Sequence, residues 1–384
     1  MRIMMIGGGF APAKKYGGPV VSMVNLCNFD TTSEYFVITR NHDWKEEEKL
    51  VGIHSGWNVF NDNTKVLYLE DKDHTIETYK NIISEIEPDL IYINGFYLAH
   101  MYVPVIIAAQ KKKVPLLIAP RGTLNKNAMA LKSVKKYVYC IFMRFLLEKK
   151  RTFFQSTSDE ETERIHDLLG INQNKICVVE NVPTIPNAIV NAAKKEKGII
   201  RCCFFARICK KKNLLGALDI LQNCKENVIF NIYGNAEDQE YWKLCEKKID
   251  SMPANVSVYY KGEYDHDRVF DLMKDNHIFL FPTFSENYGH VIVEALLAQL
   301  PVIISDQTPW NEVNDYKAGY ALPLKETDAF TAAVDYYASM DSIEFEEQRR
   351  NVHEYVKQAL QLEELKKKYS MMYTKVIEPC NKEL

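Results

Sequence analysis

The sequence predicts an α/β protein built from two doubly wound domains. The chain has 384 residues, which is more than one hydrophobic core usually spans. Short apolar segments typical of buried parallel strands alternate with segments whose apolar residues recur at helical spacing. This alternation occurs on both sides of residues 183–197, which contain two prolines and three lysines and lack a clear period. We therefore expect domains over residues 1–185 and 186–358 and a terminal helix over residues 359–384.

The expected elements follow from the two hydrophobic periods. In the first half we expect strands at residues 3–6, 35–39, 65–69, 90–93 and 116–119 and from residue 153, with helices at residues 20–26, 75–86 and 103–110. In the second half we expect strands at residues 200–206, 228–233, 256–261, 278–281 and 302–305, with helices at residues 214–222, 240–249 and 268–274.

Two glycine-rich segments lie near the N-terminus. The first, residues 7–9, lacks the Gly-x-Gly-x-x-Gly spacing of a dinucleotide fingerprint, and a tight turn explains it at least as well. The second, Gly17 and Gly18, precedes Pro19 and a helix pattern, and proline suits the first turn of a helix. Glycines before a helix start let backbone amides approach an anion closely, so this second segment is a candidate anion site.

Two turns of the first half follow strand segments directly. One contains Asn94 and Gly95, and the other contains Arg121 between a proline and a glycine. Open α/β sheets bind ligands at the carboxyl ends of their strands, which makes Arg121 a candidate ligand residue. A surface arginine at a Pro-Gly turn is an alternative of equal weight.

Two cations of the second half suit a diphosphate. Arg207 follows a strand segment and Lys212 precedes a helix pattern. Arginine binds phosphate oxygens through its fork and lysine as a point charge, and both neutralise the charge that develops on a leaving nucleoside diphosphate. Three consecutive lysines at residues 210–212 would by themselves indicate a solvated turn.

The most informative stretch, residues 278–296, predicts a strand, a polar loop and a helix. Glu286 lies in the loop, and Glu294 lies within the apolar run of the helix. A carboxylate in a buried helix is costly unless it is hydrogen-bonded, and a ligand with paired hydroxyls would supply such bonds. The helix start would favour a phosphate beside both carboxylates. The candidate binding residues at this start are Asn287, Tyr288, Gly289 and His290.

The sequence predicts no metal site. Asp265 and Asp267 match an Asp-x-Asp pattern, but they open an amphipathic helix pattern, where one aspartate caps the helix and the other complements its dipole. No spacing of histidines and cysteines indicates zinc.

Charge is distributed unevenly along the chain. Residues 111–151 contain twelve lysines and arginines and one acid, so they contribute +11 and the remaining residues −14 to the formal net charge of −3. That net charge argues against nucleic acid as a partner. The basic segment also carries Tyr139, Phe142 and Phe145, and such a composition can lie on an anionic membrane. A solvated basic face over an aromatic core is the alternative.

Nine cysteines without regular spacing indicate free thiols in a reducing compartment. The chain opens directly on a strand segment and has no apolar run of membrane-spanning length. We expect a cytoplasmic protein that can attach peripherally to the inner face of the plasma membrane.

The spacing Glu286-x7-Glu294, within Ser-Glu-Asn-Tyr-Gly-His-Val-Ile-Val-Glu-Ala, resembles the signature of the family-four retaining glycosyltransferases of GT-B fold, the glycosyl transferases group 1. The segment from Ala206 to Asn213 resembles the family's Gly-Arg…Lys-Gly pattern, with Ala206 and Asn213 in place of its two glycines. The last amphipathic segment resembles the family's terminal helix, which crosses back to the first domain.

The resemblance implies a role for each candidate residue. A UDP- or GDP-linked sugar would bind in an interdomain cleft, mainly to the second domain, and be transferred to a glycan or a polyprenyl- or lipid-linked saccharide in surface polysaccharide biosynthesis. Glu294 would hold the ribose hydroxyls and Glu286 the donor sugar, while Arg207 and Lys212 would hold the diphosphate. The remaining implied contacts are Gly17 and Gly18 with the diphosphate, Arg121 with a sugar, and Lys261 and Gly262 with the base.

The resemblance implies no metal and no cofactor besides the donor. Other activities remain open: a sugar-nucleotide epimerase, a sugar phosphorylase or a non-catalytic sugar-nucleotide-binding protein would share the fold. A nicotinamide-dependent oxidoreductase would share the glycine-rich first strand, but the dinucleotide fingerprint is missing.

Overall fold

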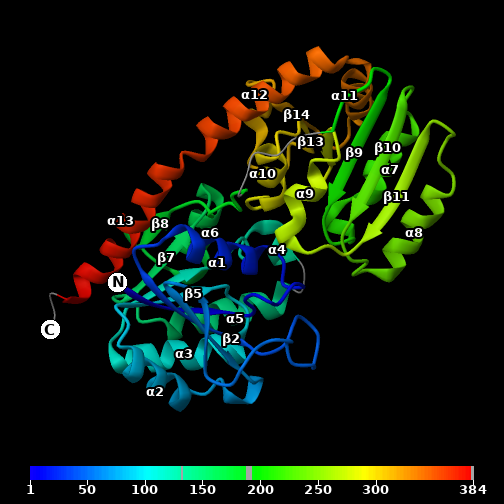
Figure 1. Cartoon of the computed structure of the whole chain (residues 1–384). Helices are drawn as coiled ribbons and strands as arrows, with labels where there is room; N and C mark the ends of the chain where they lie inside the picture. Colours follow the sequence, from blue (N-terminus) through cyan, green and yellow to red (C-terminus); the bar gives the residue numbers. More distant parts are fainter. Residues whose placement is uncertain (131–132, 187–192, 382–384) are drawn as a thin grey trace. The chain divides into compact units, whose positions relative to one another are not determined.

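The protein is described by a computed structural model that covers residues 1–130, 133–186 and 193–381 (Figure 1). The chain divides into two compact units: Met1–Val182 with Leu362–Leu384, and Pro183–Gln361. Both boundaries lie three residues from the expected ones. Residues 187–192 of the expected linker and Lys132 of the basic segment lie outside the described residues.

The first unit contains an eight-stranded sheet in the order β3-β4-β2-β1-β5-β6-β7-β8. All neighbouring strands are parallel except β3, which pairs with β4 in antiparallel orientation. The sequence did not predict the two edge strands, β3 and β8, which are short and partly exposed. The strands are β1 Arg2–Gly7, β2 Glu34–Arg40, β3 Trp57–Asn61, β4 Thr64–Leu69, β5 Leu90–Asn94, β6 Leu116–Ala119, β7 Thr152–Ser156 and β8 Ile176–Val178.

Helices cover both faces of this sheet, and each face has its own apolar core. Side chains of α2, α3, α5 and α6 form one core, and side chains of α1 and α13 contribute to the other. Because both faces are covered, the central strands are apolar throughout rather than alternating. The helices are α1 Gly18–Phe29, α2 Ile76–Ile86, α3 Ala99–Lys112, α4 Lys126–Ala130, α5 Ser133–Leu146, α6 Asp159–Leu169 and α13 Leu362–Asn381.

The terminal helix α13 belongs to the first unit, which confirms the expected return of the chain. Its buried residues recur at helical spacing and include Tyr369, whose hydroxyl donates to the carbonyl oxygen of Glu180 at 3.0 Å. Lys368 forms an ion pair with the Glu180 carboxylate at 3.0 Å. The last helix is therefore fixed to the first sheet by apolar burial and by polar contacts.

The second unit contains a six-stranded parallel sheet in the order β11-β10-β9-β12-β13-β14. Its strands are β9 Ile199–Phe205, β10 Asn227–Tyr233, β11 Val256–Gly262, β12 Ile278–Phe281, β13 Val302–Ser305 and β14 Gly319–Leu322, and the sequence did not predict β14. Its helices are α7 Leu214–Gln222, α8 Gln239–Ile249, α9 Val269–Met273, α10 His290–Leu297, α11 Thr327–Ser339 and α12 Ser342–Leu360.

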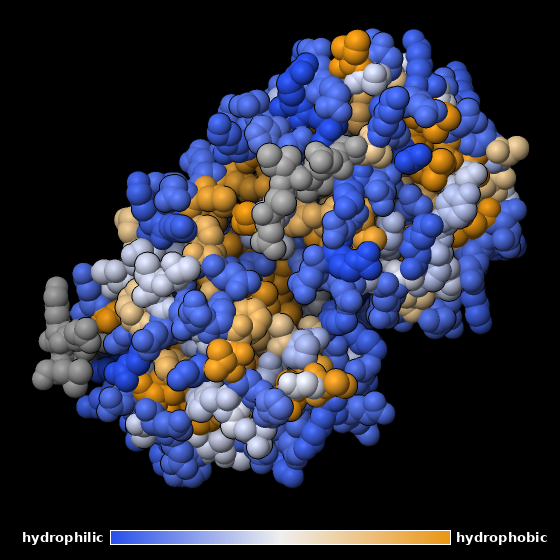
Figure 2. All heavy atoms as spheres, in the orientation of Figure 1, coloured by the Kyte–Doolittle hydropathy of each residue, from blue (hydrophilic) through white to orange (hydrophobic). Residues whose placement is uncertain are grey.

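Parallel strands bring all their carboxyl ends to one edge of the sheet. In the second unit the loops after β9, β11 and β12 carry Arg207, His266 and Glu286 to this edge. The surface in view is mainly hydrophilic, with scattered hydrophobic patches (Figure 2). The carboxyl edge is therefore the place to look for a site.

Candidate functional site

The loop after β9 runs against the end of β10, because glycine at position 234 permits a close approach. The amide of Ala206 donates to the carbonyl oxygen of Tyr233 at 3.0 Å. A Cβ atom at Gly234, where φ is +137°, would lie 1.9 Å from the carbonyl oxygen of Ala206. This contact fixes the start of the loop and places Arg207, whose Nη1 donates to Oε2 of Glu237 at 2.5 Å.

Lys212 and Glu286, which both belong to the predicted site, are in direct contact. Nζ of Lys212 donates to Oε1 of Glu286 at 2.5 Å, and the side chains are only 16% and 11% exposed. The hydroxyl of Thr283 donates to the same carboxylate oxygen at 3.2 Å. The loops after β9 and β12 are thereby joined through a cation, a carboxylate and a hydroxyl.

Asn213 explains why the loop can end without the glycine of the family pattern. Its φ is +56°, in the left-handed region that asparagine tolerates better than most residues. Its side chain accepts from the amide of Gly216 at 3.2 Å as the N-cap of α7. Its Nδ2 donates to the carbonyl oxygen of Pro282 at 2.8 Å, which ties the loop to the end of β12.

The predicted loop and helix around Gly289 are confirmed. Gly289 is the N-cap of α10 with φ +76°, and the helix begins at His290. The ring of Tyr288 packs against that of Trp310 with centroids 5.7 Å apart, and Nε1 of Trp310 donates to the Tyr288 carbonyl oxygen at 2.5 Å. These contacts hold the start of α10, where backbone amides favour an anion, in a fixed position.

Glu294 is buried in α10, at 1% exposure, and has two donors. The hydroxyl of Thr184 donates to its Oε1 at 2.9 Å, and Nε2 of His266 lies 2.8 Å from the same oxygen. The sequence did not assign a role to His266. His266 lies in the loop after β11, and loops at the carboxyl ends of parallel strands commonly carry ligand-binding residues. This position is the signal that could have identified it.

The electrostatics of this pair favour a charged state. Burial raises the pKa of Glu294, but the hydrogen bond and charge of His266 and the bond from Thr184 outweigh burial and hold this pKa below its usual value. Burial lowers the pKa of His266, but the hydrogen bond and charge of Glu294 raise this pKa above its usual value overall. The pair is therefore imidazolium and carboxylate over a window of mildly acidic pH.

Lys261 and Gly262 lie at the end of the edge strand β11. Nζ of Lys261 lies 5.0 Å from the ring centroid of Tyr259, its neighbour on the same face of the strand. The carbonyl oxygen of Gly262 accepts from the amide of Gly234 at 2.8 Å, so this residue helps to hold the ends of β10 and β11 together.

The Asp265 side chain makes no cap hydrogen bond, although its position is the N-cap of a short 3-10 helix over residues 266–268.

In the first unit, Asn94 joins the two candidate segments. Gly17 is the N-cap of α1 with φ +69°, and α1 begins at Gly18 with Pro19 in its first turn. Nδ2 of Asn94 donates to the carbonyl oxygen of Pro19 at 2.9 Å, and its Oδ1 accepts from Nε of Arg121 at 2.6 Å. The start of α1 and Arg121 therefore lie at the same carboxyl edge of the first sheet.

The Arg121 guanidinium is bound to protein groups on several sides. Besides Asn94, it donates to the hydroxyl of Tyr92 at 2.5 Å and to Oδ1 of Asn181. Its backbone is left-handed, with φ +57°, which is uncommon for a residue with a side chain. The Arg121 guanidinium therefore binds protein groups, and it holds the ends of β5 and β6 together.

The glycines of the first turn are structural. A Cβ atom at Gly9 would lie 2.3 Å from the ring of Tyr16, and one at Gly7 would lie 2.2 Å from the sulfur of Met23. The turn after β1 is therefore packed closely by side chains, which agrees with the tight-turn interpretation.

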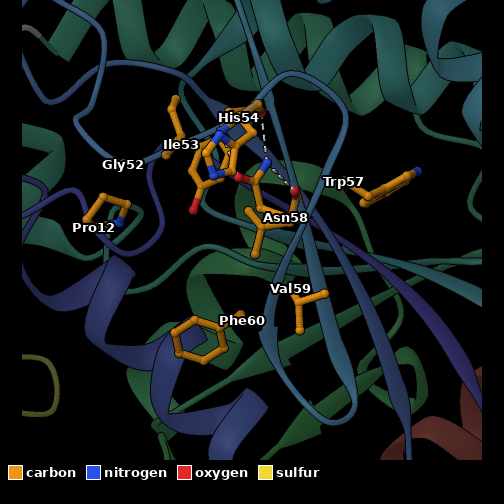
Figure 3. Close-up of a pocket in the computed structure, with 10 residues that line it drawn as sticks. Pro12, Gly52, Ile53, His54, Trp57, Asn58, Val59 and Phe60 are labelled. Atoms are coloured by element: carbon orange, nitrogen blue, oxygen red, sulfur yellow. Dashed lines mark hydrogen bonds between the residues drawn. The ribbon is translucent and has the colours of Figure 1, made fainter.

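A separate cavity of about 320 Å³ lies in the first unit and contains none of the predicted site residues. Its lining includes Pro12, His54, Asn58 and Tyr68, and Figure 3 shows His54 and Asn58 joined by hydrogen bonds while Trp57 points away from them. The clustered charges of the second unit are the better candidate site, because they combine cations, carboxylates and a helix start. Over the described ranges, no three histidines, cysteines or acids are grouped to hold a metal ion.

Comparison with known proteins gives a family match in the second unit and one curated relative. Residues 187–359 match the family model described as Glycosyl transferases group 1. A curated relative, an uncharacterized 41.2 kDa protein in the cps region of Klebsiella pneumoniae, is 26% identical over 262 residues, which cover 64% of this chain and 68% of that protein.

Solved glycosyltransferase structures match both units of the chain. The crystal structure of Anabaena Alr3699/HepE in complex with UDP and glucose has a TM-score of 0.72 at 15% identity and covers 97% of this chain and 99% of that one. A glycosyltransferase from Rickettsia africae ESF-5 gives 0.70 at 14% identity and covers 98% of each chain. WaaG, a glycosyltransferase involved in lipopolysaccharide biosynthesis, gives 0.66 at 15% identity and covers 97% of this chain and 99% of that one. The chain therefore has the GT-B fold, and its residues 187–359 match the model of the Glycosyl transferases group 1 family.

Proposed function

We propose that this chain transfers a sugar from a UDP- or GDP-linked donor to a glycan or a lipid-linked saccharide, with retention of anomeric configuration and without a metal ion. The observation that carries this proposal is the arrangement around α10. Glu286 lies before the helix start and is paired with Lys212, while Glu294 lies within the helix and is paired with His266. Hydroxyl acceptors, cations and an anion-binding helix start thus gather at one sheet edge.

Glu294 is the proposed acceptor for the ribose hydroxyls. Its carboxylate is buried, is charged and already accepts two hydrogen bonds at Oε1. A buried carboxylate held in this way is positioned for a bidentate bond to a diol. Thr184 and His266 would keep the carboxylate charged and oriented while the nucleotide binds.

Lys212 and Arg207 are the proposed partners of the diphosphate. Each is held by a carboxylate, at 2.5 Å in both cases. A diphosphate carries more charge than a carboxylate and would compete for both cations. Release of Glu286 from Lys212 would then free its carboxylate to accept hydroxyls of the donor sugar.

The proposed transfer needs no dedicated protein base. The bond between the anomeric carbon and the diphosphate oxygen breaks, and the acceptor oxygen bonds to the anomeric carbon on the same face. The departing diphosphate takes the proton of the acceptor hydroxyl. Arg207, Lys212 and the amides at the start of α10 would stabilise the charge on that diphosphate as it develops.

The compared proteins support a nucleotide-sugar donor and a polysaccharide product. The Anabaena protein has been crystallised with UDP-glucose, and a TarM mutant with UDP, fondaparinux and α-GlcNAc-glycerol. The Klebsiella pneumoniae relative is encoded in a cps region, and WaaG acts in lipopolysaccharide biosynthesis. We propose that the present enzyme works in the cytoplasm, at the inner face of the membrane, in surface polysaccharide biosynthesis.

The test is release of nucleoside diphosphate from a panel of UDP- and GDP-sugars, with soluble and lipid-linked saccharide acceptors and with and without a chelator. We expect acceptor-dependent release with one donor, an unchanged rate in the chelator, and a product whose anomeric configuration, read by NMR, matches the donor. Glu286→Gln and Glu294→Gln should lower the rate, while Glu246→Gln, an exposed carboxylate on α8, should not.

Each alternative activity has its own signature in this assay. An epimerase would change the sugar without an acceptor, and a phosphorylase would consume a glycan and inorganic phosphate without a nucleotide. A non-catalytic protein would bind a nucleotide sugar but leave it intact. Any of these outcomes, or inversion at the anomeric carbon, would contradict the proposal.

A further inference from the structure

Three of the nine histidines lie together at the carboxyl edge of the first sheet. His42 follows β2, His74 lies between β4 and α2, and His100 lies in the first turn of α3. They are grouped around an ion pair between Arg40, the last residue of β2, and Asp71, which lies just after β4. We call these five residues the histidine cluster. The proposed donor contacts include none of them, and neither does the lining of the cavity of about 320 Å³.

The ion pair between Arg40 and Asp71 forms the base of the histidine cluster. Nε and Nη2 of Arg40 donate to the two carboxylate oxygens of Asp71, each at 2.7 Å. Nη1 of Arg40 donates to the hydroxyl of Tyr16 at 3.1 Å. The hydrogen bond from Arg40 lowers the pKa of Asp71 to about 2, so the carboxylate is charged at neutral pH. Both oxygens of this carboxylate are therefore already bound to a cation.

Two of the histidines point a ring nitrogen toward this carboxylate. Nε2 of His42 lies 3.4 Å from Oδ1 of Asp71, and Nε2 of His100 lies 3.7 Å from the same oxygen. Nδ1 of His42 lies 3.0 Å from the carbonyl oxygen of Asp43. Because a carbonyl oxygen only accepts, this Nδ1 carries the hydrogen, and Nε2 of His42 is the nitrogen that gains a proton when the ring becomes charged. Protonation of the two rings thus adds donors beside the Arg40 guanidinium.

His74 is the buried member of the histidine cluster, at 4% exposure. Its Nδ1 lies 2.7 Å from the hydroxyl of Tyr79, which can donate to it and leave the ring hydrogen on Nε2. That Nε2 is buried and has no hydrogen-bond partner among the residues that the structure describes. The ring centroid lies 6.3 Å from that of His100. A buried donor without a partner is costly, and a ligand oxygen would supply the missing partner.

The histidine cluster is open to solvent on one side only. The side chains of Asp71 and His100 are 47% and 45% exposed, whereas those of Arg40 and His42 are 12% and 13% exposed. A ligand would therefore enter past an exposed rim and meet charged groups that are largely shielded from water. Interactions between charges are stronger in such a place than at the open surface.

The balance of donors and acceptors indicates the kind of ligand. The guanidinium and the three imidazoles supply donors, and the only carboxylate of the histidine cluster is occupied by Arg40. Sugar hydroxyls need acceptors as well as donors, whereas a carboxylate or phosphate group only accepts. A metal ion is not favoured, because no three of these groups, or of any others in the described ranges, are placed to hold one. An anionic group fits best.

We infer that the histidine cluster binds the carboxylate or phosphate group of an acidic acceptor saccharide. Tyr16, to which Arg40 donates, directly precedes Gly17 at the start of α1, so the cluster adjoins the first-unit segment expected to contact the diphosphate. The inference rests on the proposed function for the role of the ligand as acceptor. Binding of the anionic group itself is testable without any turnover.

Binding of an anion here should be accompanied by uptake of protons. Burial lowers the pKa of His74 to about 4 and raises the pKa values of Tyr16 and Tyr79, so these groups stay neutral between pH 6 and pH 8. Imidazole generally changes its charge in this range, and an anion prefers the charged form. His42 and His100 are therefore the groups through which affinity should increase as the pH falls. The charged groups facing the histidines are Arg40 and Asp71, and the backbone of Asp43 contacts His42.

The experiment follows the Cε1–H resonances of histidine in the full-length protein by NMR during titration with glucuronate, glucose or inorganic phosphate. Histidine-to-glutamine variants at positions 42, 74 and 100 assign the three resonances. We expect glucuronate or phosphate to shift them, with affinity at least about tenfold higher at pH 6 than at pH 8. Glucose, which differs from glucuronate by the absence of the carboxylate, should leave them in place. The effective anion tells a uronic acid from a sugar phosphate.

His100 is the best position for variants, because its side chain is exposed and its replacement should not disturb folding. His100→Gln should weaken anion binding about tenfold, since a charge-assisted hydrogen bond is lost. His100→Lys keeps a positive charge at every pH tested and should bind at pH 8 nearly as well as at pH 6. His353→Gln, at an exposed position of α12, is the matched control and should bind like the wild type.

Three results would overturn the inference. Neither anion could shift a resonance of the histidine cluster at pH 6, the affinity could be the same at pH 6 and pH 8, or glucose could shift the resonances as strongly as glucuronate. The last result would assign the cluster to neutral sugars.

Kinetics on the same variants separate this inference from the proposed function. His100→Gln should raise KM for an acidic acceptor about tenfold with little change in kcat, because the contact is equally strong before and in the transition state. Nucleoside diphosphate binding should be unchanged. Anion binding without any sugar transfer would contradict the proposed function alone, and transfer without anion binding would contradict this inference alone.

Discussion

The pair formed by His266 and Glu294 allows a sharp test of the electrostatics of the site. His266→Ala removes the cation and leaves Glu294, a carboxylate at 1% exposure, with the hydroxyl of Thr184. Breaking a fully buried ion pair costs about 3–5 kcal/mol. The His266 side chain is 36% exposed, so solvent screening reduces this figure, and the remaining hydrogen bond reduces it further. We expect the free energy of unfolding of the second unit to fall by about 1–3 kcal/mol.

The pH dependence has a definite sign. The pKa of folded Glu294 lies below its ordinary 4.5, so this group contributes stability above that pH and loses it as the pH falls through the folded value. The pKa of folded His266 lies above its ordinary 6.5, so its contribution is complete below pH 6.5 and is lost as the pH rises through the raised value. The wild type should therefore be less stable at pH 9 than at pH 6 by the contribution of this pair.

Urea unfolding of the full chain, followed by tryptophan fluorescence, measures the effect, since Trp242 and Trp310 both lie in the second unit. His266→Ala should remove the part of the pH dependence between pH 6 and pH 9 that the pair supplies. His266→Gln is the matched control, because its neutral amide can still donate to Glu294 and should recover part of the lost stability without the pH dependence. Equal stability of the wild type and His266→Ala at every pH would refute the ion pair.

Three further predictions concern the other residues of the two sheet edges. Lys212→Ala and Arg207→Ala should each lower turnover about a hundredfold, because each removes a cation from the leaving diphosphate, and near-normal turnover in both would exclude them from the site. Glu294→Gln should weaken nucleoside diphosphate binding, because the charged acceptor of the ribose hydroxyls is lost. Unchanged affinity in calorimetry would show that Glu294 does not bind the nucleotide. Arg121→Ala should lower the free energy of unfolding by about 2 kcal/mol, because Asn94 and its other acceptors lose a charged donor. Chemical denaturation checks the last prediction, and recovery in Arg121→Lys would contradict the need for a forked donor.

Local patterns in the sequence were sufficient for the fold class and for the central loop. The strands near residues 3–6, 90–93 and 278–281 are apolar because both faces of each sheet are covered, and that pattern can be read without the structure. The turn at Gly289 and the helix after it are likewise local, since glycine supplies the left-handed N-cap. The sequence does not predict the edge strands β3, β8 and β14, because short and partly exposed strands have a weak period.

What the sequence could not supply are the partners of the site residues. His266 is 28 residues from Glu294, Glu237 is 30 from Arg207, and Asn181 is 60 from Arg121. Such pairs are created by strand order, which brings separate strand ends to one edge. Arg121 is an example. The sequence of its turn gave equal weight to a ligand-binding residue and a surface residue. In the structure it instead forms hydrogen bonds with Asn94 and Tyr92, which neither interpretation predicts.

The sequence by itself determined that this protein has two α/β units, a basic segment at residues 111–151 and a strand–loop–helix with two spaced glutamates, because these features depend only on composition and period. Only the tertiary structure decided which apolar side chains of α5 are buried. The helix has apolar residues on two opposite faces, so the spacing of these residues does not indicate which face is buried. Packing in the first unit turns Tyr139 inward and leaves Phe142 and Phe145 in solvent, although the membrane interpretation of the sequence treats all three alike. A helix with two apolar faces is oriented by the shape of the core it meets, and that shape depends on the whole fold.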